Sequence, residues 1–497
     1  MSESTRLTGE RTTALGLREM MDAGEISSSE LIWHFLDRVA RYDSGTGGVN
    51  AILELNPDAP HIAEARDREL AENGPRGPLH GLPVLLKDNI DTGDRMHTSA
   101  GTLALAQSRA RRDAFFVQKL REAGAVIMGK TNMTEMANFM TRGMPNGYSS
   151  RGGQVLNPYG PAEFDVGGSS SGSAAAVAAE FSPLAVGTET SGSILSPASR
   201  NSLVGIKPTV GLISRRGVIP ISHSQDTAGP MATTVADAAL MLGAMAGVDV
   251  EDPVTETARG NAVSDYTTFL KADGLRGARL GVPEGYLEDL DESRMALVER
   301  ALDAMREAGA TIVDLADLPT GELEWPPTVL LYEFKPALNV YLDGLDPRVP
   351  VHSLRELIRF NLEHSRATLR YGQILLQKSE ATSGTLTEPK YIMGRRRDLL
   401  NSRQNGIDQV MAEWDLDALV FADNLGSGPA ARAGYPSITV PGGYDESGSP
   451  LGITFTARAF AEPRLIELAH SFERVTRFRV PPAPDGETPR RPPRAAG

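Results

Sequence analysis

Two loops rich in glycine and serine hold the residues of this sequence that are best suited to chemistry. The first is Gly167–Ser173, which contains Ser169 and Ser170, and the second is Gly187–Ser193. A serine hydroxyl can act as a nucleophile or relay a proton, and glycine lets the backbone approach a bound group closely. A flexible linker is the alternative interpretation, but the Ala/Val run at 174–179 between the loops predicts a helix. We therefore interpret the two loops as parts of one site.

A third candidate group, Lys87, lies upstream at the end of the apolar run Val84–Leu86, which predicts a buried strand. A lysine that follows such a strand can simply extend its amine into solvent. It can also be buried, and because desolvation lowers the pKa of the amine, it can then act as a neutral base. The sequence by itself does not decide between these interpretations.

Two other kinds of site are disfavoured. Gly168–Gly172 matches the G-x-S-x-G pattern of a nucleophile elbow with Ser170 at its centre, but residues 158–165 make a poor preceding strand. The eight histidines form no H-x-H or H-E-x-x-H pair, and the sequence contains no cysteine. We therefore expect no histidine- or cysteine-ligated metal site and no thiolate catalysis. No metal or organic cofactor is implied.

The elements that must position these residues predict an α/β protein. Between about residues 80 and 245, apolar runs alternate with helical patterns, which favours a parallel or mixed sheet covered on both faces. The sequence predicts strands at 51–55, 84–86, 126–128, 203–206, 218–221, 279–282, 311–313, 417–421, 437–440 and 452–455, with a loop at 129–132. It predicts two helices within 6–42 and others at 58–72, 113–123, 133–139, 174–179, 235–246, 292–308 and 464–474.

The chain divides into one large domain and a tail. We assign residues 1–480 to the domain, with the core motifs in 80–230. Residues 322–412 are mostly helical and richer in charge and aromatic side chains, and we expect them to form a wall over a substrate pocket. Residues 481–497 are rich in proline and arginine and are expected to be disordered.

Composition limits the function classes. The formal net charge of −14 over 497 residues opposes electrostatic attraction to nucleic acid or to an anionic membrane. No run of apolar residues is long enough to span a bilayer, and the N-terminus has no apolar signal core. We expect a cytoplasmic protein that acts on a small molecule, as a monomer or a homodimer.

Lys87 and the two loops together closely resemble the amidase signature family, over roughly residues 8 to 475. Within it the chain looks closest to the peptide-amidase-like branch, through Glu189-Thr190 and Ser222–Pro230. The matching stretches are Gly81–Asn89, Gly167–Ser173, Gly187–Pro197, Gly205–Thr209, Gln225–Pro230, Ala433–Pro441 and Gly452–Ile453. The resemblance implies one α/β/α layered domain around a wide, twisted, mixed β-sheet.

The resemblance also implies a Ser–Ser–Lys triad. Ser193 corresponds to the nucleophile, Ser169 to the bridging serine and Lys87 to the base. The backbone N–H groups of Thr190, Ser191, Gly192 and Ser193 would form the oxyanion hole. Ser170 and Asp226 would support the triad, with simple loop hydrogen bonding as the alternative. Met133, Phe139, Tyr332 and Phe334 are candidates for the substrate pocket, with ordinary packing as the alternative.

The sequence departs from the family pattern near the nucleophile. Ser191 stands where members often carry glycine, and Leu195 stands where they often carry arginine. The loss of that positive charge argues against a carboxylate-bearing substrate and so against a component of an amidotransferase. The resemblance implies an amidase that hydrolyses a carboxamide through an acyl-enzyme. The same triad acting on carbamates (a urethanase), anilides or aryl esters is the alternative.

Overall fold

One wide mixed sheet forms the centre of the protein. The computed structural model describes residues 7, 12–45, 47–319 and 326–482, and within these ranges eleven strands join in a single sheet. In sheet order the strands are β1 (Ile52–Leu55), β3 (Val126–Thr131), β2 (Pro83–Lys87), β6 (Leu184–Glu189), β8 (Thr227–Ala232), β7 (Val204–Lys207), β12 (Ser437–Tyr444), β13 (Pro450–Thr456), β11 (Ala418–Ala422), β9 (Arg279–Pro283) and β10 (Thr311–Leu315). A separate hairpin pairs β4 (Tyr148–Ser149) with β5 (Gly153–Gln154).

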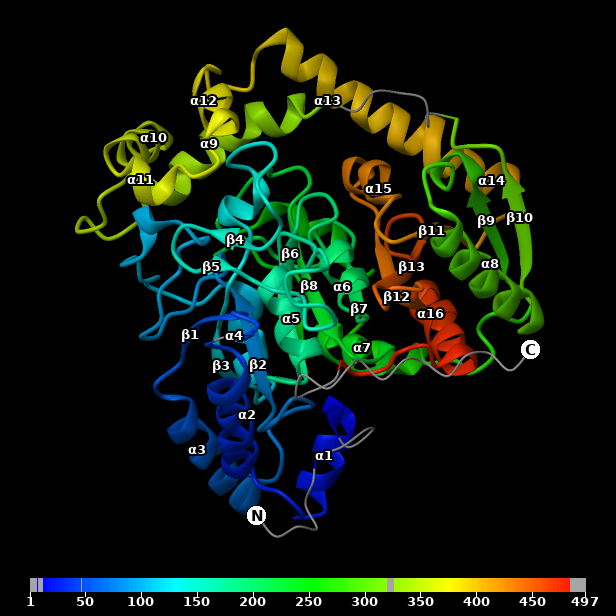
Figure 1. Cartoon of the computed structure of the whole chain (residues 1–497), viewed down its shortest axis with the longest axis horizontal. Helices are drawn as coiled ribbons and strands as arrows, with labels where there is room; N and C mark the ends of the chain where they lie inside the picture. Colours follow the sequence, from blue (N-terminus) through cyan, green and yellow to red (C-terminus); the bar gives the residue numbers. More distant parts are fainter. Residues whose placement is uncertain (1–6, 8–11, 46, 320–325, 483–497) are drawn as a thin grey trace.

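Strand direction varies across the sheet (Figure 1). β2 pairs in parallel with both β3 and β6, and β9 pairs in parallel with both β10 and β11. The strands between these two groups, and the edge strand β1, pair antiparallel with their neighbours. Because β2 and β6 are parallel neighbours, their carboxyl ends meet at the same edge of the sheet.

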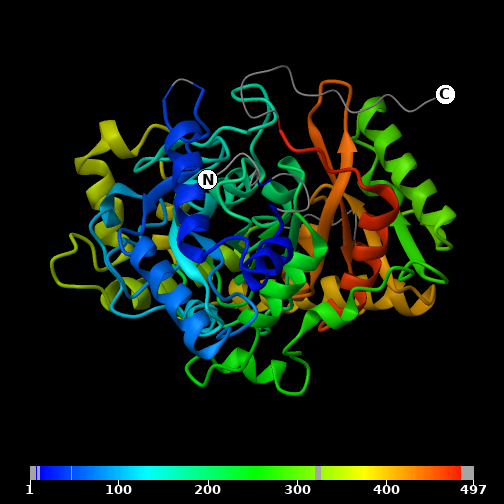
Figure 2. The same ribbon diagram turned by 90° about the horizontal axis from the view of Figure 1, so that it is seen from below.

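Helices cover both faces of the sheet. On one face α5 (Ser171–Ala178) and α6 (Leu195–Arg200) contact each other and the central strands. On the other face α4 (Phe115–Glu122), α7 (Val235–Met245), α16 (Glu462–Thr476) and α8 (Glu292–Glu307) form a continuous row of contacts (Figure 2). Two N-terminal helices, α2 (Ser28–Tyr42) and α3 (Ala59–Asn73), lie at the β1 end, whereas α1 (Ala14–Asp22) contacts α7. This layering confirms the predicted α/β/α architecture.

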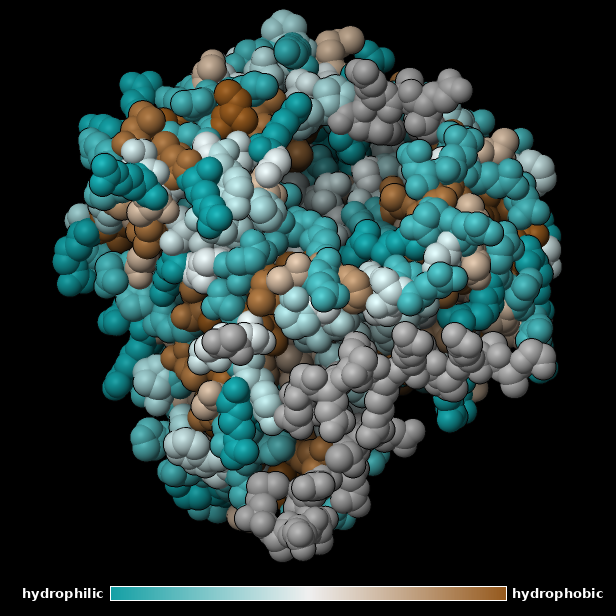
Figure 3. Space-filling model, in the orientation of Figure 1, coloured by the Kyte–Doolittle hydropathy of each residue, from teal (hydrophilic) through white to brown (hydrophobic). Residues whose placement is uncertain are grey.

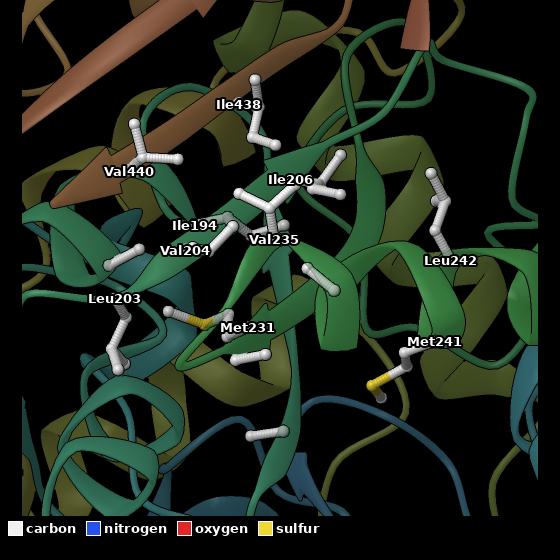
Figure 4. Packing of buried hydrophobic residues seen from close by; sticks show 14 of the residues in the cluster. Ile194, Leu203, Val204, Ile206, Met231, Val235, Met241, Leu242, Ile438 and Val440 are labelled. Carbon is white, nitrogen blue, oxygen red and sulfur yellow. The ribbon is translucent and has the colours of Figure 1, made fainter. Parts of the chain in front are cut away.

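Apolar side chains of the central strands form the core between the layers. Figure 4 shows Ile206 of β7, Met231 of β8, and Ile438 and Val440 of β12 gathered with Ile194. All five side chains are buried. Ile194 directly follows Ser193, so the core holds the residue next to the candidate nucleophile.

A second apolar cluster includes side chains of a helical block, whose helices Figure 1 shows along the top of the view. The described part of the block runs from 326 to 413 and contains α9 (Thr328–Asp343), α10 (Leu354–Glu363), α11 (Ser365–Thr368), α12 (Ile374–Glu380), α13 (Pro389–Ser402) and α14 (Asp408–Glu413). α15 (Ser427–Ala433) contacts α13 from the side of the sheet. The prediction of a mostly helical segment here is confirmed for these residues, and its role as a substrate wall stays a prediction.

Most predicted elements are present, but the region after β3 differs. Residues 129–131 continue β3 instead of forming a loop. Residues 133–139 contain only a short turn at Glu135–Asn138, in which three residues have left-handed φ values, and the N–H of Met136 donates to the Ala100 carbonyl instead of to its own helix. Residues 218–221 make one isolated bridge, between Val218 and Ile90, instead of a strand.

Two further expectations concern the ends and the environment of the chain. The predicted disordered tail, residues 481–497, lies outside the described residues from 483 onward, and the boundaries proposed for the domain stay predictions. In the described ranges no helix combines the length and the apolar character needed to cross a bilayer.

Candidate active site

Lys87 ends β2 in the interior of the protein. Its side chain has no exposed surface. The Nζ atom lies 2.8 Å from Ser169 Oγ and 3.1 Å from the carbonyl oxygen of Thr188. The interpretation in which the lysine extends into solvent is therefore wrong, and the amine is placed between the two Gly/Ser loops.

Burial shifts the protonation of this amine. Desolvation penalises the charged form and lowers the pKa of Lys87 from 10.5 to about 7, against the opposing charges of Glu189 and Asp226. Near neutral pH a substantial fraction of Lys87 is therefore uncharged. A neutral amine has a lone pair and can accept a proton from the Ser169 hydroxyl.

The first Gly/Ser loop brings Ser169 beside the second loop. The peptide bond between Gly168 and Ser169 is cis. The carbonyl of Ser169 accepts from the N–H of Thr134 (3.1 Å), and the N–H of Ser170 donates to the carbonyl of Ser193 (3.2 Å). The backbones that carry the two candidate serines are thus linked directly by one hydrogen bond.

Ser170 has a supporting position and does not sit on a nucleophile elbow. Its buried hydroxyl donates to the Thr188 carbonyl (3.1 Å), the same oxygen that Lys87 contacts. No strand directly precedes it, since β5 ends at Gln154 and α5 begins at Ser171. The structure therefore agrees with the rejection of a nucleophile elbow at this serine.

The second loop is shaped by the carboxylate of Glu189, the last residue of β6. It accepts from the N–H groups of Gly192 (2.7 Å), Ile194 (2.7 Å) and Leu195 (3.1 Å). Gly192 has a φ of +81°, and a Cβ there would lie 2.8 Å from Asn424 Nδ2. Because the Gly192 N–H already donates to Glu189, it is not available as an oxyanion donor, which corrects that part of the expected hole.

Three glycines of the sheet leave space for the side chain of Ile194 at the end of this loop. A Cβ at Gly187 of β6, Gly205 of β7 or Gly229 of β8 would lie 3.1, 3.1 or 3.0 Å from the side chain of Ile194. The three strands are neighbours in the sheet, so together they leave room for this one buried side chain. Ile194 therefore anchors Ser193 to the middle of the sheet.

Ser193 lies at the surface end of this anchored loop. The residue is 8% exposed, and its Oγ makes no hydrogen bond to any residue that the structure describes. Within the described ranges the N–H groups of Thr190, Ser191 and Ser193 also have no acceptor. The loop thus presents one hydroxyl and three backbone donors that are free to interact with a bound group.

Asp226 supports the same loop from the adjacent segment. Its Oδ1 accepts from the Thr190 hydroxyl (2.6 Å), and its Oδ2 accepts from the N–H groups of Ile221 and Ser222 (2.8 Å each). Burial raises the pKa of Asp226 to about 6. Asp226 thus links Thr190 to the segment at 221–222, and its role in supporting the triad stays a prediction.

The four pocket candidates fall into two groups. Met133, Phe139 and Phe334 are buried together in the cluster under α9, where the two phenylalanine rings lie 5.0 Å apart. Tyr332 stacks on Tyr391 of α13, with ring centroids 6.0 Å apart. These contacts match the packing alternative, and contact with substrate stays a prediction for all four.

Two cavities adjoin the helical block. One of about 800 Å³ lies between α9 and the loop that carries Asp226, and its lining includes Val218, Pro220 and Tyr341. The other, of about 680 Å³, runs along α13 past Tyr391. Figure 3 shows the surface hollowed below α13. Among the residues that the structure describes, no cluster of histidine and carboxylate side chains is suited to hold a metal ion.

Comparison with known proteins gives consistent matches over nearly the whole chain. A family model described as Amidase matches residues 30–466. The crystal structure of the peptide amidase PAM, bound to the competitive inhibitor chymostatin, superposes with a TM-score of 0.91 at 46% identity and covers 95% of this chain and 99% of that one. A probable amidase of Arabidopsis thaliana is 40% identical over 95% of this chain and 91% of its own length. A component of the glutamyl-tRNA(Gln) amidotransferase of Ralstonia nicotianae is 34% identical over 94% of this chain and 98% of its own length.

The buried amine predicts a specific dependence of stability on pH. Between its folded pKa of about 7 and its ordinary value of 10.5, Lys87 is protonated in the unfolded chain but not in the folded one, so the free energy of unfolding rises with pH in this window. Lys87→Met lacks this contribution. We expect the variant to gain stability relative to wild type at pH 7 and to lose that advantage steadily toward pH 10.

Urea unfolding at several pH values measures this difference. The exposed Lys271 provides the matched control, because Lys271→Met should track wild type throughout. A difference between Lys87→Met and wild type that does not change over the window would show that the amine is not desolvated.

Proposed function

The chain belongs to the amidase signature family and is a hydrolase of carbon–nitrogen bonds, and from this premise we propose that it cleaves carboxamides with Ser193, Ser169 and Lys87 as a catalytic triad. The observation that carries the proposal is the 2.8 Å contact between the fully buried Lys87 amine and the Ser169 hydroxyl. The family resemblance, carried by the motifs around these positions, assigns the same three residues.

In the proposed first step Ser193 Oγ attacks the carbonyl carbon of the substrate. Its proton passes to Ser169 Oγ, while the Ser169 proton passes to the neutral Lys87 amine. The carbonyl π electrons move to oxygen, and the N–H groups of Thr190, Ser191 and Ser193 are the candidate donors to that oxyanion. Such donors are worth about 3–4 kcal/mol each in the transition state.

Collapse of the tetrahedral intermediate breaks the C–N bond. The proton returns from Lys87 through Ser169 to the leaving nitrogen, so that a neutral amine or ammonia departs and an ester to Ser193 remains. Water then attacks this ester and gives its proton through Ser169 to Lys87. The proton returns through Ser169 to Ser193 Oγ as the ester bond breaks, and the acid product leaves. The residues assigned to the triad account for every proton, and no step requires a metal or an organic cofactor.

Peptide carboxamides are the substrate class that we propose first. The support is the similarity to a peptide amidase, at 46% identity over 95% of this chain. Leu195 adds to it, because its side chain is fully buried and its N–H donates to Glu189, so no cation is offered to a substrate carboxylate at this position. We propose a cytoplasmic enzyme of small amide substrates.

Replacing the nucleophile tests the triad. Ser193→Ala is expected to lower kcat by about 10⁴-fold or more, since loss of the nucleophile removes the covalent route. Ser196→Ala, three residues further on, provides the matched control and should retain wild-type kcat. A fluorophosphonate should label wild type at Ser193, as mapped by peptide mass spectrometry. Wild-type hydrolysis by Ser193→Ala, or labelling at another serine, would disprove the assignment.

The pKa of the base predicts the pH profile of the reaction. With Lys87 near 7, kcat/KM should rise from pH 5 to about 8 as the free enzyme loses this proton, because only the neutral amine can accept a proton. A substrate without a titratable group isolates the enzyme's own dependence. A profile that is flat over this range would exclude a neutral lysine base.

A matched substrate panel tests the bond that is cleaved. One peptide acyl group is offered as the primary amide, the anilide and the alkyl ester, together with an aryl carbamate. We expect the primary amide to be hydrolysed with release of ammonia and Ser193→Ala to be inactive on it. Preference for the carbamate by more than about tenfold in kcat/KM, or 1.4 kcal/mol, would instead favour a urethanase.

A further inference from the structure

Glu333 is a buried acid in the helical block that takes no part in the proposed chemistry. It lies on α9 and has no exposed surface. Its Oε2 accepts from the hydroxyl of Ser222 and from the N–H (3.2 Å) and hydroxyl (2.9 Å) of Ser224. Its Oε1 accepts from the Tyr391 hydroxyl of α13 (2.9 Å) and lies 3.4 Å from His223 Nε2. One carboxylate thus joins two helices to one loop.

That loop, residues 221–226, leads directly to the candidate oxyanion donors. The N–H of Ser222 donates to Asp226 (2.8 Å), and Asp226 accepts from the Thr190 hydroxyl (2.6 Å). Thr190 also lies within reach of Gln225, whose Nε2 is 3.5 Å from the Thr190 carbonyl. Ser222, Asp226 and Thr190 therefore connect Glu333 to the end of β6, where the loop that carries Ser193 begins.

One side of this loop adjoins a cavity, and Ile221, Ser222 and Gln225 are buried. The cavity of about 800 Å³ lies on its α9 side, and the lining includes Pro220, His223 and Asp226. The bonds to Glu333 cross from α9 to the loop beside this space, so they fix its position.

We propose that Glu333 is a positioning residue that sets the geometry of the oxyanion donors through Ser222, Asp226 and Thr190. The inference rests on the proposed function of the second Gly/Ser loop, which carries Ser193. It gives the helical block a role besides the predicted substrate wall, because the block then holds the loop that orients Thr190. Its loss should therefore act on the chemical step more than on substrate binding.

The test is a split between kcat and KM. Glu333→Ala removes every acceptor, and we expect kcat to fall about 10- to 100-fold while KM changes by less than about threefold, because small displacements of catalytic groups cost rate without loss of binding. Glu333→Gln keeps an oxygen for the two serines and an amide for Tyr391, and it should restore kcat to within about threefold of wild type.

Glu380→Ala is the matched control within the same block. Glu380 on α12 pairs with Arg355 (3.1 Å) and Lys335 (3.6 Å) and has no bond to the 221–226 loop among the described contacts. It should retain wild-type kcat. An equal loss in Glu380→Ala, an effect on KM alone, or an equal loss in Glu333→Ala and Glu333→Gln would each overturn the proposal.

A second variant keeps the test decisive if Glu333→Ala does not fold. Ser222→Ala with Ser224→Ala removes both hydroxyl donors from the loop side and leaves the Tyr391 bond in place, and it should show the same kcat-selective loss of about tenfold. Unchanged kcat in this folded double variant would overturn the proposal.

Fluorophosphonate labelling separates this inference from the proposed function. The reagent forms an Oγ–P bond at Ser193 as fluoride leaves, and its tetrahedral adduct uses the same donors as the substrate. The labelling rate of Glu333→Ala should fall in parallel with its kcat, and a labelling rate equal to that of wild type would overturn the inference. Absence of labelling in wild type would instead contradict the proposed function.

Discussion

The desolvation of one amine is the constraint on which the site depends. Lys87 can have a pKa near 7 only if no carboxylate pairs with it in the interior. Two acids lie close enough to raise that pKa, and both are committed to other donors. Glu189 accepts three backbone N–H groups, and Asp226 accepts two N–H groups and a hydroxyl. The same bonds that shape the nucleophile loop therefore keep these carboxylates away from the lysine.

The topology of the sheet explains how residues so far apart in sequence meet. β2 and β6 are parallel neighbours, so Lys87 and Glu189 leave the sheet at the same edge. α5 connects the first loop to β6 and packs against that strand, so the first loop lies at the same edge. The second loop is then fixed by Ile194, which occupies the space left by glycines on three adjacent strands. The loop that carries Ser193 is therefore anchored in the core through Ile194.

Local patterns predicted the framework better than the contacts within it. The apolar run at 84–86 and the Ala/Val run at 174–179 each have a uniform composition, and the structure forms β2 and α5 there. Residues 133–139 carry an equally helical composition, yet the N–H groups of Thr134 and Met136 donate to Ser169 and Ala100 in other loops, which local sequence does not encode. The proximity of Lys87 to Ser169 came from family resemblance, and the contacts of Glu333 had no sequence signal because the loop that they hold lies more than a hundred residues away.

Overall similarity does not separate a self-contained hydrolase from a component of an amidotransferase, because both kinds of relative match over more than nine-tenths of the chain. We propose that the difference lies in a few positions near Ser193, the proposed nucleophile. Ser191 replaces a common glycine without adopting a left-handed φ, since that conformation falls on Gly192, so the turn does not depend on it. Leu195 is different, because it places a buried apolar side chain where family members often carry arginine. Position 195 therefore offers no counter-ion to a substrate carboxylate, which supports the proposed carboxamide substrate.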